Sequence, residues 1–456
     1  MDATLKSLTD FTQKLRFEDL SREAIHQCKR RVIDTLGCAL GGFHAPPSRI
    51  ARGVARRSSS RTPARILGTL EQTSPELAAF ANGVMIRYLD LNDATGLGGG
   101  HPSDMFGALF AVAEARAVTG RDFTTAVVAA YELYMSFFEA RQVRDRGMDH
   151  VIYTAAGAAA GAAMLMKLDH ASTANAISLA LTPNMALGVT RRGQLSMWKG
   201  CAGGNASRNA VFAAELAADG LAGPSAVFDG DHGVWNAIGQ SNWPPFRVQE
   251  QWFRISITQI KMYPCIYPGQ SPVTAALEIA PQVRAEDIDS VLVRTYLNAW
   301  WESASEPEMW APATRETADH SIPYLVSAAL LDGKIDVSSF DDARRNAPDM
   351  QDLIRKVQVI HDKELDKLTP SNDPCRMEVT LRNGRKVSSS VEFPKGHLKN
   401  PASDAEVEQK FAKMNGGLLS PAQVARVLDM CWNLEKIQDF RSLISEMQAS
   451  ASVAAE

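Results

Sequence analysis

The sequence lacks any pair of cysteines at the short spacing of a metal site. Its six cysteines lie far apart along 456 residues: Cys28, Cys38, Cys201, Cys265, Cys375 and Cys431. The absence of C-x-x-C argues against a zinc ribbon and against a cysteine-rich iron–sulfur motif, whereas spacing alone leaves open a cluster held by three distant cysteines. Cysteines scattered in this way are typical of a protein in the reducing cytosol.

The sequence also has no apolar run long enough for a membrane span. Its most apolar stretch, residues 153–168, is rich in Ala and Gly and interrupted by Lys167, and it is shorter than the roughly 18 residues of a span, so it predicts a buried helix. The N-terminal residues include acidic side chains and form no apolar core, which argues against a signal or transit peptide. We therefore expect a soluble, cytoplasmic protein.

A surplus of basic residues is absent too. The 48 Lys and Arg residues stand against 52 Asp and Glu residues, which gives a net charge of −4. Broad binding to nucleic acid or to an anionic membrane would need a basic surplus, so we expect neither as a partner. An anionic small-molecule substrate is compatible with this charge if positive side chains gather locally.

Several common catalytic motifs are missing. The sequence contains no G-x-S-x-G elbow, no P-loop and no H-E-x-x-H, which argues against common hydrolases, kinases and zinc proteases. The glycine run at residues 96–100 is not a dinucleotide fingerprint, because no βαβ pattern surrounds it. Because no His/Glu pair has metal-ligand spacing and the cysteines are scattered, we expect an enzyme without a metal or other cofactor.

Apolar residues recur at three- and four-residue spacing through the first half of the chain. This periodicity predicts helices over residues 24–40, 76–88, 104–119, 124–139 and 205–219. Residues 154–163 are nearly all small, so a helix there can approach its neighbours closely and is expected at the centre of a bundle.

The pattern changes after Pro244-Pro245, where β-rich segments begin. Strands are predicted over residues 290–297, 356–360, 376–381 and 387–393, and the last two flank Asn383-Gly384, a strong hairpin signal. Helices are predicted over residues 270–279 and 323–331, and the helical pattern returns at residue 404. The length predicts two or three domains. We place a helical domain at 1–257, a smaller α+β domain at 258–402, and C-terminal helices that pack back on the first domain at 403–456.

One segment combines two carboxylates, a glycine-rich loop and a histidine. Asp90 and Asp93 stand three residues apart, a spacing that shares a helix face, and the loop then leads to His101, Pro102 and Asp104. Pro and Asp suit the start of a helix, where backbone N–H groups can hold an anion. The same residues also fit an ordinary capped turn in which Asp104 is the cap.

Four further segments combine charged residues with glycine or proline. They are Asp149-His150, residues 191–200 with Arg191, Arg192 and Lys199, residues 261–271 beginning at Lys261, and residues 315–324 with Asp319, His320 and Tyr324. Each has a structural alternative. A histidine near a helix start is more often structural, and a lysine beside a tryptophan also occurs in a surface loop.

Together and in this order, these segments resemble the MmgE/PrpD family, which includes 2-methylcitrate dehydratase, cis-aconitate decarboxylase and iminodisuccinate epimerase. The similar segments are RRVIDTLGCALGG, the aspartate pair with HPSD, DH at 149–150, QLSMWKGCA, IKMYP and RETADHSIPY. QLSMWKG and RETADHS are most similar to the 2-methylcitrate dehydratase branch. The resemblance implies a large all-helical domain formed by both chain ends, an inserted α+β lid, an active site at their junction, and a homodimer.

By motif position, the resemblance also implies two sets of site residues and no cofactor. The catalytic set is Asp90, His101, His150 and Tyr324. The substrate-binding set by motif is Lys199 and Lys261, with Asp93 and His320 as adjacent candidates. Arg191 and Arg192 are added to this set because their positive charge could help Lys199 and Lys261 to bind carboxylates.

The chemistry of the family accounts for these residue types. Removing a proton α to a carboxylate creates negative charge that an enzyme without metal must stabilise with fixed cations and hydrogen-bond donors. We expect Lys199 and Lys261 to bind substrate carboxylates from opposite sides of the domain cleft. His101, His150 and Asp90 can supply a base and an acid. We favour His150 as the base, because the small-residue helix after it would fix its position.

One departure from the family pattern concerns the substrate. Family members commonly have Thr directly after the second aspartate, but here Ala94 occupies that place and Thr95 follows. The loop to His101 is also one residue shorter than in the dehydratases. The favoured function is the dehydration of a citrate-like tricarboxylic acid. Epimerisation or decarboxylation of a related polycarboxylic acid is the alternative, and a non-catalytic helical scaffold is the alternative of a different class.

Overall fold

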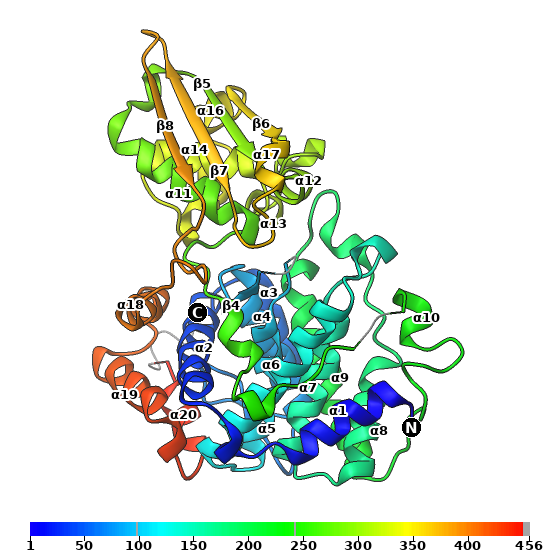
Figure 1. The fold of residues 1–456 in the computed structure, drawn as a ribbon. Coiled ribbons are helices and arrows are strands. Elements are labelled where there is room, and N and C mark those ends of the chain that lie inside the picture. The colour runs from blue at the N-terminus through cyan, green and yellow to red at the C-terminus, as the bar shows by residue number, and fades with distance from the viewer. Residues whose placement is uncertain (97–98, 241–242, 450–456) are drawn as a thin grey trace.

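The computed structural model describes residues 1–96, 99–240 and 243–449. Within these residues the protein is mainly helical and has a four-stranded mixed sheet in its C-terminal half (Figure 1). The predicted mainly helical class with a smaller β-containing part agrees with this content. Leu97 and Gly98 of the glycine run lie outside the described residues. No helix in the described part of the chain is long and apolar enough to cross a membrane.

Long helices make up the first half of the chain, in the lower part of Figure 1. Their starts follow from local sequence, since Asp2, Ser21 and Thr119 each accept a backbone N–H from the first turn of the helix that follows. Each helix predicted in this half is confirmed, although α9 begins at Trp198, well before the predicted start at residue 205. The helices are α1 (Ala3–Lys14), α2 (Arg22–Gly41), α3 (Pro46–Ala55), α4 (Pro75–Tyr88), α5 (Phe106–Ala115), α6 (Gly120–Ala140), α7 (Val151–Leu165), α8 (His170–Leu181), α9 (Trp198–Ala218) and α10 (Val234–Ile238).

Small residues allow the central helices to approach closely. A Cβ on Gly83 of α4 would lie 2.5 Å from the Cα of Gly204 in α9, so this contact requires glycine. Nearer the helix ends, a Cβ on Gly200 would lie 3.3 Å from the Cα of Tyr88. The end of α4 and the start of α9 therefore lie side by side. The helix of small residues, α7, packs against α5, α6, α8 and α9, as its composition predicts.

The mixed sheet lies in the upper part of Figure 1, with strand order β6-β5-β7-β8. β5 pairs parallel with β6 and antiparallel with β7, which in turn pairs antiparallel with β8. Val293 of β5 is buried opposite Met377 of β7, and α11 and α14 pack against the sheet. The predicted hairpin at Asn383-Gly384 is confirmed, and Gly384 has the positive φ of 83° that this turn needs. The elements of this region are α11 (Gln270–Ile279), β5 (Ile288–Thr295), α12 (Leu297–Ser303), α13 (Arg315–Ala318), α14 (Ile322–Asp332), α15 (Asp342–Arg345), α16 (Pro348–Ile354), β6 (Val357–His361), α17 (Lys363–Asp366), β7 (Cys375–Leu381) and β8 (Lys386–Val391).

Helices return near the C-terminus as α18 (Asp404–Met414), α19 (Pro421–Trp432) and α20 (Arg441–Glu446). α18 and α19 pack against α2, and α20 packs against α5. Leu36 and Phe411, from opposite ends of the chain, belong to one hydrophobic core, whereas buried apolar residues between 265 and 391 form a second core. The domain boundaries at residues 257/258 and 402/403 stay predictions.

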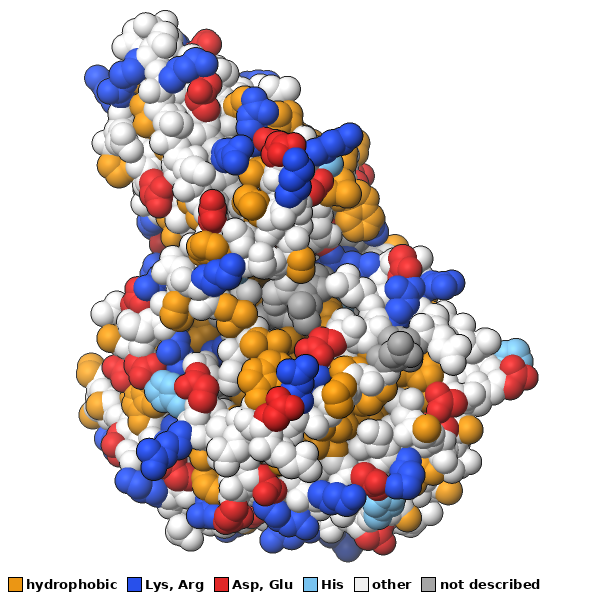
Figure 2. Space-filling model, in the orientation of Figure 1, with side chains coloured by type: hydrophobic (Ala, Val, Ile, Leu, Met, Phe, Trp, Pro, Cys, Tyr) orange, Lys and Arg blue, Asp and Glu red, His pale blue; other side chains and the backbone are white. Residues whose placement is uncertain are grey.

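Two pairs of very short strands complete the described structure. They are β1 (Ala64–Arg65) with β2 (Gln72–Thr73), and β3 (Ala94–Thr95) with β4 (Thr258–Gln259). The β3–β4 pair matters for the site, because it joins the loop after Asp93 to the segment that carries Lys261. Over the face drawn in Figure 2, acidic and basic side chains are interspersed, in keeping with the small net charge.

Candidate active site

Asp90 is the centre of a buried group of charged side chains. Helix α4 ends at Tyr88, and Asp90 adopts a left-handed φ of 52°. The prediction that Asp90 and Asp93 share a helix face is therefore wrong, because the chain leaves the helix before either aspartate. The turn at Asp90 lets Nη1 of Arg87 lie 2.9 Å from its Oδ1.

Two lysines contact the same carboxylate. Lys199, in the first turn of α9, has its Nζ 3.0 Å from Oδ2 of Asp90. Lys261, which follows β4, donates from its Nζ to Oδ1. Both lysines are buried. The structure thus places them together on a carboxylate of the protein, not on opposite sides of a cleft.

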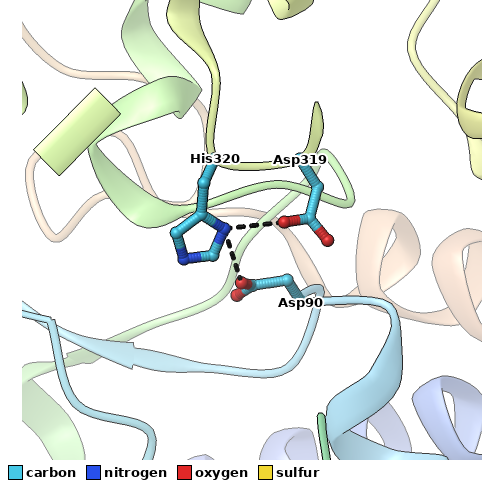
Figure 3. A group of neighbouring side chains, drawn as sticks. All are labelled: Asp90, Asp319 and His320. Atoms are coloured by element: carbon cyan, nitrogen blue, oxygen red, sulfur yellow. Dashed lines mark hydrogen bonds and ion pairs between the residues drawn. The ribbon is translucent and has the colours of Figure 1, made fainter. Parts of the chain in front are cut away.

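A second aspartate joins this group from the segment just before α14. Oδ1 of Asp319 lies 2.6 Å from Nζ of Lys199 and 2.6 Å from Nδ1 of His320. Its Oδ2 accepts a hydrogen bond from Arg315 at 2.8 Å. Figure 3 shows the His320 Nδ1 between the two carboxylates, 3.7 Å from Oδ2 of Asp90. We call the set Arg87, Asp90, Lys199, Lys261 and Asp319 the Asp90 cluster.

The charges of the Asp90 cluster fix its protonation. Burial alone would raise the pKa of Asp90, but Arg87, Lys199 and Lys261 outweigh it and lower that pKa well below its usual range. Burial would likewise raise the pKa of Asp319, and Lys199 with the other donors lowers it. Both carboxylates are therefore ionised at neutral pH.

Asp90, Asp319 and His320 are also close enough together to be considered as metal ligands. Their ligand atoms lie within 4.8 Å of one another (Figure 3). The two carboxylates, however, already contact the cations Arg87, Lys199, Lys261 and Arg315. A divalent ion would have to displace these cations or be repelled by them, so the donor set does not fit a metal.

His101 and Asp93 lie at the two ends of the glycine-rich loop and contact each other. Nδ1 of His101 is 2.7 Å from the carbonyl oxygen of Asp93, and its Nε2 is 3.9 Å from Oδ1 of Asp90. The Asp93 carboxylate accepts hydrogen bonds from the Ser103 backbone N–H at 2.9 Å and from the Tyr131 hydroxyl at 2.8 Å. The helix start after His101 does bind an anion, as predicted, but the anion is Asp93 itself. Asp93 is thus engaged within the protein.

A cavity of about 350 Å³ lies beside the Asp90 cluster. Its wall includes His320, which contacts the cluster, and His150, which precedes α7 as predicted. The wall also includes three arginines, Arg144, Arg191 and Arg192, which we call the arginine wall. Asp149 and Glu302 line the cavity as well, so it presents three guanidinium groups and two carboxylates next to two imidazoles.

Each member of the arginine wall has an acidic partner. Nε of Arg191 lies 3.0 Å from Oδ2 of Asp149, while its Nη2 has no hydrogen-bond partner among the described residues. Arg144 forms an ion pair with Glu302 of α12, and Nη1 of Arg192 lies 3.1 Å from Oε1 of Glu306. The pairs of Arg144 and Arg192 join the helical part of the chain to the segment around α12.

The guanidinium of Arg192 also stacks on an aromatic ring, 3.6 Å from the centroid of Trp301. Trp301 and Glu302 both line the cavity. The arginine wall is thus held in place by an aromatic ring and by acidic side chains.

The three histidines of the site are unprotonated at neutral pH. Burial lowers the pKa of His150 to about 3 and, together with Lys199, that of His320 to about 4. Burial and the charges of Arg87 and Lys261 lower the pKa of His101 well below its usual range. Neutral imidazoles next to cations can accept a proton but do not donate one as acids.

Tyr324 does not join the site. Its hydroxyl donates to the carbonyl of Ser339, and its ring lies 6.0 Å from that of Phe340 in the second core. Burial raises its pKa to about 12, so it stays protonated. The catalytic role that the resemblance implies for Tyr324 has no support in this arrangement, in which the residue packs the core.

Sequence reasoning missed several residues that the structure brings to the site. Arg87 stands three residues before Asp90, a spacing that signals an ion pair. Arg144 opens the charged run RDRGMDH that leads to His150. Asp319 was named within RETADHSIPY but given no role, because nothing in the sequence distinguished it from a surface acid. Tyr134, whose hydroxyl accepts the His101 backbone N–H at 2.8 Å, carries no sequence signal.

Comparison with known proteins covers nearly all of the chain. The profile of the MmgE/PrpD N-terminal domain matches residues 6–246, and that of the C-terminal domain matches residues 263–434. A 2-methylcitrate dehydratase of Cupriavidus necator is 27% identical, with 88% of this chain and 87% of the relative covered. The 2-methylcitrate dehydratase-like protein oryR of Aspergillus oryzae is 29% identical over 94% of this chain and 92% of its own. The human cis-aconitate decarboxylase is 26% identical over 95% and 93%.

Proposed function

The chain belongs to the MmgE/PrpD family, and from this premise we propose that it is a lyase acting on small polycarboxylic acids. The favoured reaction is the dehydration of a citrate-like tricarboxylic acid such as 2-methylcitrate. The observation that carries the proposal is one cavity lined both by Arg144, Arg191 and Arg192 and by unprotonated histidines.

The arginine wall supports binding of a substrate with several carboxylates. Guanidinium groups form paired hydrogen bonds with carboxylates, and such charge-assisted bonds are short and strong. Nη2 of Arg191 is a buried donor with no partner among the described residues, so a small shift of this side chain would let it bind a substrate carboxylate without breaking a protein contact. Three arginines stand against two acids, Asp149 and Glu302, in the lining of a cavity of about 350 Å³, and this surplus of positive charge favours a small anionic substrate.

The unprotonated histidines support the abstraction of a proton. The carbon next to a carboxylate becomes acidic only if the charge that develops on that carboxylate is stabilised, and the arginines are placed to do this. A neutral imidazole then takes the proton, and loss of the hydroxyl from the neighbouring carbon gives the alkene and water. The fixed cations replace a metal ion in this scheme, so no cofactor is needed.

Decarboxylation is the second candidate. Two relatives with cis-aconitate decarboxylase in their names are about as similar to this chain as the dehydratases, at 25% and 26% identity. Loss of carbon dioxide from a polycarboxylate also leaves negative charge that the same arginines would stabilise. Epimerisation shares the initial proton abstraction and is the third candidate.

The test is turnover of a substrate panel. We expect 2-methylcitrate or citrate to give a rising ultraviolet absorbance as a conjugated alkene forms, with a product lighter by one water in mass spectrometry. Tricarballylate, which has no hydroxyl to lose, should inhibit without reacting. Release of carbon dioxide from cis-aconitate would favour the decarboxylase. Full activity after dialysis against a strong chelator is expected, and no turnover of any substrate would contradict the lyase proposal.

A further inference from the structure

The three histidines of the site differ in what their ring nitrogens contact. His150 has Nδ1 3.3 Å from the Tyr134 hydroxyl and Nε2 3.5 Å from Oδ1 of Asp149. Both of its nitrogens therefore face groups of the protein. His101 has Nδ1 on the Asp93 carbonyl and Nε2 toward Asp90, and it is not among the cavity-lining residues.

His320 is arranged differently. Its Nδ1 lies between Asp319 and Asp90, and the ring carries Nε2 away from both carboxylates (Figure 3). Among the described residues, no group forms a hydrogen bond with this Nε2, and His320 lines the cavity. A ring nitrogen without a protein partner, on the wall where substrate enters, is the arrangement that a general base requires.

We propose that His320 is the general base, with Nε2 as the accepting atom, and that Asp319 is the residue that positions it. The proposal rests on the lyase function above and names the group that removes the α-proton. Sequence reasoning favoured His150 because a rigid helix follows it, but the contacts around the two rings favour His320.

Asp319 determines which nitrogen of His320 carries the hydrogen. Because the carboxylate is ionised and lies 2.6 Å from Nδ1, the ring places its N–H there and keeps the lone pair on Nε2. Asp319 cannot turn away, since Lys199 at 2.6 Å and Arg315 at 2.8 Å bind its two oxygens. The buried lysine thus acts through Asp319 on the base.

The step balances without a further reagent. The α C–H bond breaks, its proton forms a bond with Nε2 of His320, and its electron pair is delocalised into the adjacent carboxylate at the arginine wall. The pair then forms the C=C bond as the C–O bond breaks. The departing hydroxide takes the proton from the imidazolium, so that one water and one alkene leave and His320 is neutral again.

The burial of His320 is consistent with this role. Burial, and then Lys199, lowers its pKa to about 4, so the ring is unprotonated at neutral pH but is a weak base before substrate binds. A substrate carboxylate in the cavity would add negative charge nearby and raise that pKa, which strengthens the base when substrate is bound.

The experiment measures exchange of the substrate α-proton with deuterated solvent, alongside turnover of 2-methylcitrate or citrate. We expect His320→Ala to slow both by at least about 10²-fold, the size of a general-base contribution. Added imidazole should restore exchange in proportion to its concentration, which a purely structural role would not allow. His320→Asn keeps a donor for Asp319 but has no Nε2, so it should fold like the parent and stay slow. Asp319→Asn should lower kcat more than it changes KM and shift the acidic limb of the pH–rate profile.

His170→Asn is the matched control, because His170 also pairs with an aspartate, Asp10 at 2.8 Å, but lies on the surface away from the cavity. It should exchange at the parental rate and show no effect of imidazole. A folded His320→Asn variant with parental exchange would overturn the assignment of the base. If the parent protein neither exchanges nor turns over any polycarboxylate, the lyase function itself fails, so the two failures are distinct.

Discussion

The Asp90 cluster and the arginine wall both gather positive charge, but the two regions use it differently. In the cluster, Lys199 and Lys261 are buried and contact a carboxylate of the protein. On the wall, Arg144, Arg191 and Arg192 also have acidic partners, but their side chains line a cavity and are less buried than the two lysines. A cation buried against carboxylates of the protein fixes structure and protonation, whereas a cation on a cavity wall is placed to meet a ligand.

The contrast changes the role expected of the lysines. By motif they are substrate clamps, and by contact they hold Asp90 and Asp319 in the ionised state. In the proposed function the arginines then bind the substrate carboxylates, and the sequence indicated Arg191 and Arg192 for this role but not Arg144. Substitutions in each region test this difference.

The largest effect is expected from Lys261→Met, which removes one charge from the cluster. Asp90 is buried, so loss of one of its cations leaves negative charge that water cannot solvate. Removing one partner of a buried ion pair costs about 3–5 kcal/mol of unfolding free energy. Urea denaturation at neutral pH measures this cost.

Lys386→Met is the matched control for that experiment. Lys386 pairs with Glu378 at 2.8 Å, but both side chains are largely exposed, at 60% and 39%. Exposed pairs contribute about 0–1 kcal/mol. If the two variants lose the same stability, Lys261 is not part of a buried network, and its role as a substrate clamp regains support.

The second effect is expected at the arginine wall, from Arg144→Gln. The side chain lines the cavity and is 30% exposed, so its loss should weaken the binding of polycarboxylate. We expect kcat/KM to fall about 10²-fold, which corresponds to about 3 kcal/mol. The affinity for tricarballylate, measured by calorimetry, should fall as well. The unfolding free energy should also fall, because the side chain of Glu302, only 7% exposed, loses its partner, but by less than for Lys261→Met.

Arg146→Gln provides the comparison within the same turn. Arg146 lies two residues further along the turn Arg144–Arg146, is exposed and does not line the cavity. It should keep parental kcat/KM. Equal losses in the two variants would mean that general positive charge near the cavity, and not the contact at Arg144, attracts the substrate.

Much of the fold could be predicted from the sequence because its signals are local. The three- and four-residue spacing of apolar side chains marked the helices, and Asn383-Gly384 marked the hairpin of β7 and β8. The end of α4 at Tyr88 was predicted, but the left-handed turn at Asp90 was not, because Asp90 also contacts Lys199 and Lys261, which come from distant segments.

The site was predicted less completely, and for a physical reason. Motifs indicated candidate residues, but a motif does not say what a side chain contacts. His101, His150 and His320 cannot be told apart by residue type. In the structure they differ in which ring nitrogens contact a protein group. Tyr324 stands in a motif and packs a core instead. Partners from other parts of the fold decide these roles.

The smallest effect is expected on the pH dependence of stability, from His150→Asn. The pKa of His150 is about 3 in the folded protein, because the ring is buried beside the arginine wall, against about 6.5 in an unfolded chain. At pH 5.5 the unfolded chain therefore binds a proton that the folded protein does not, and stability falls as the pH is lowered through 6.5. Between pH 7.5 and 5.5 this one group should remove about 1.4 kcal/mol of unfolding free energy. The Asn variant should lose correspondingly less over that range.

Asp104 titrates in the opposite sense. Burial raises its pKa to about 6, so the folded protein gains a proton that the unfolded chain does not, and stability rises as the pH falls. Asp104→Asn should then steepen the loss on acidification while His150→Asn flattens it. Urea midpoints at the two pH values distinguish these signs, and a His150→Asn slope equal to that of the parent would mean that the pKa of His150 is the same in the folded and unfolded protein.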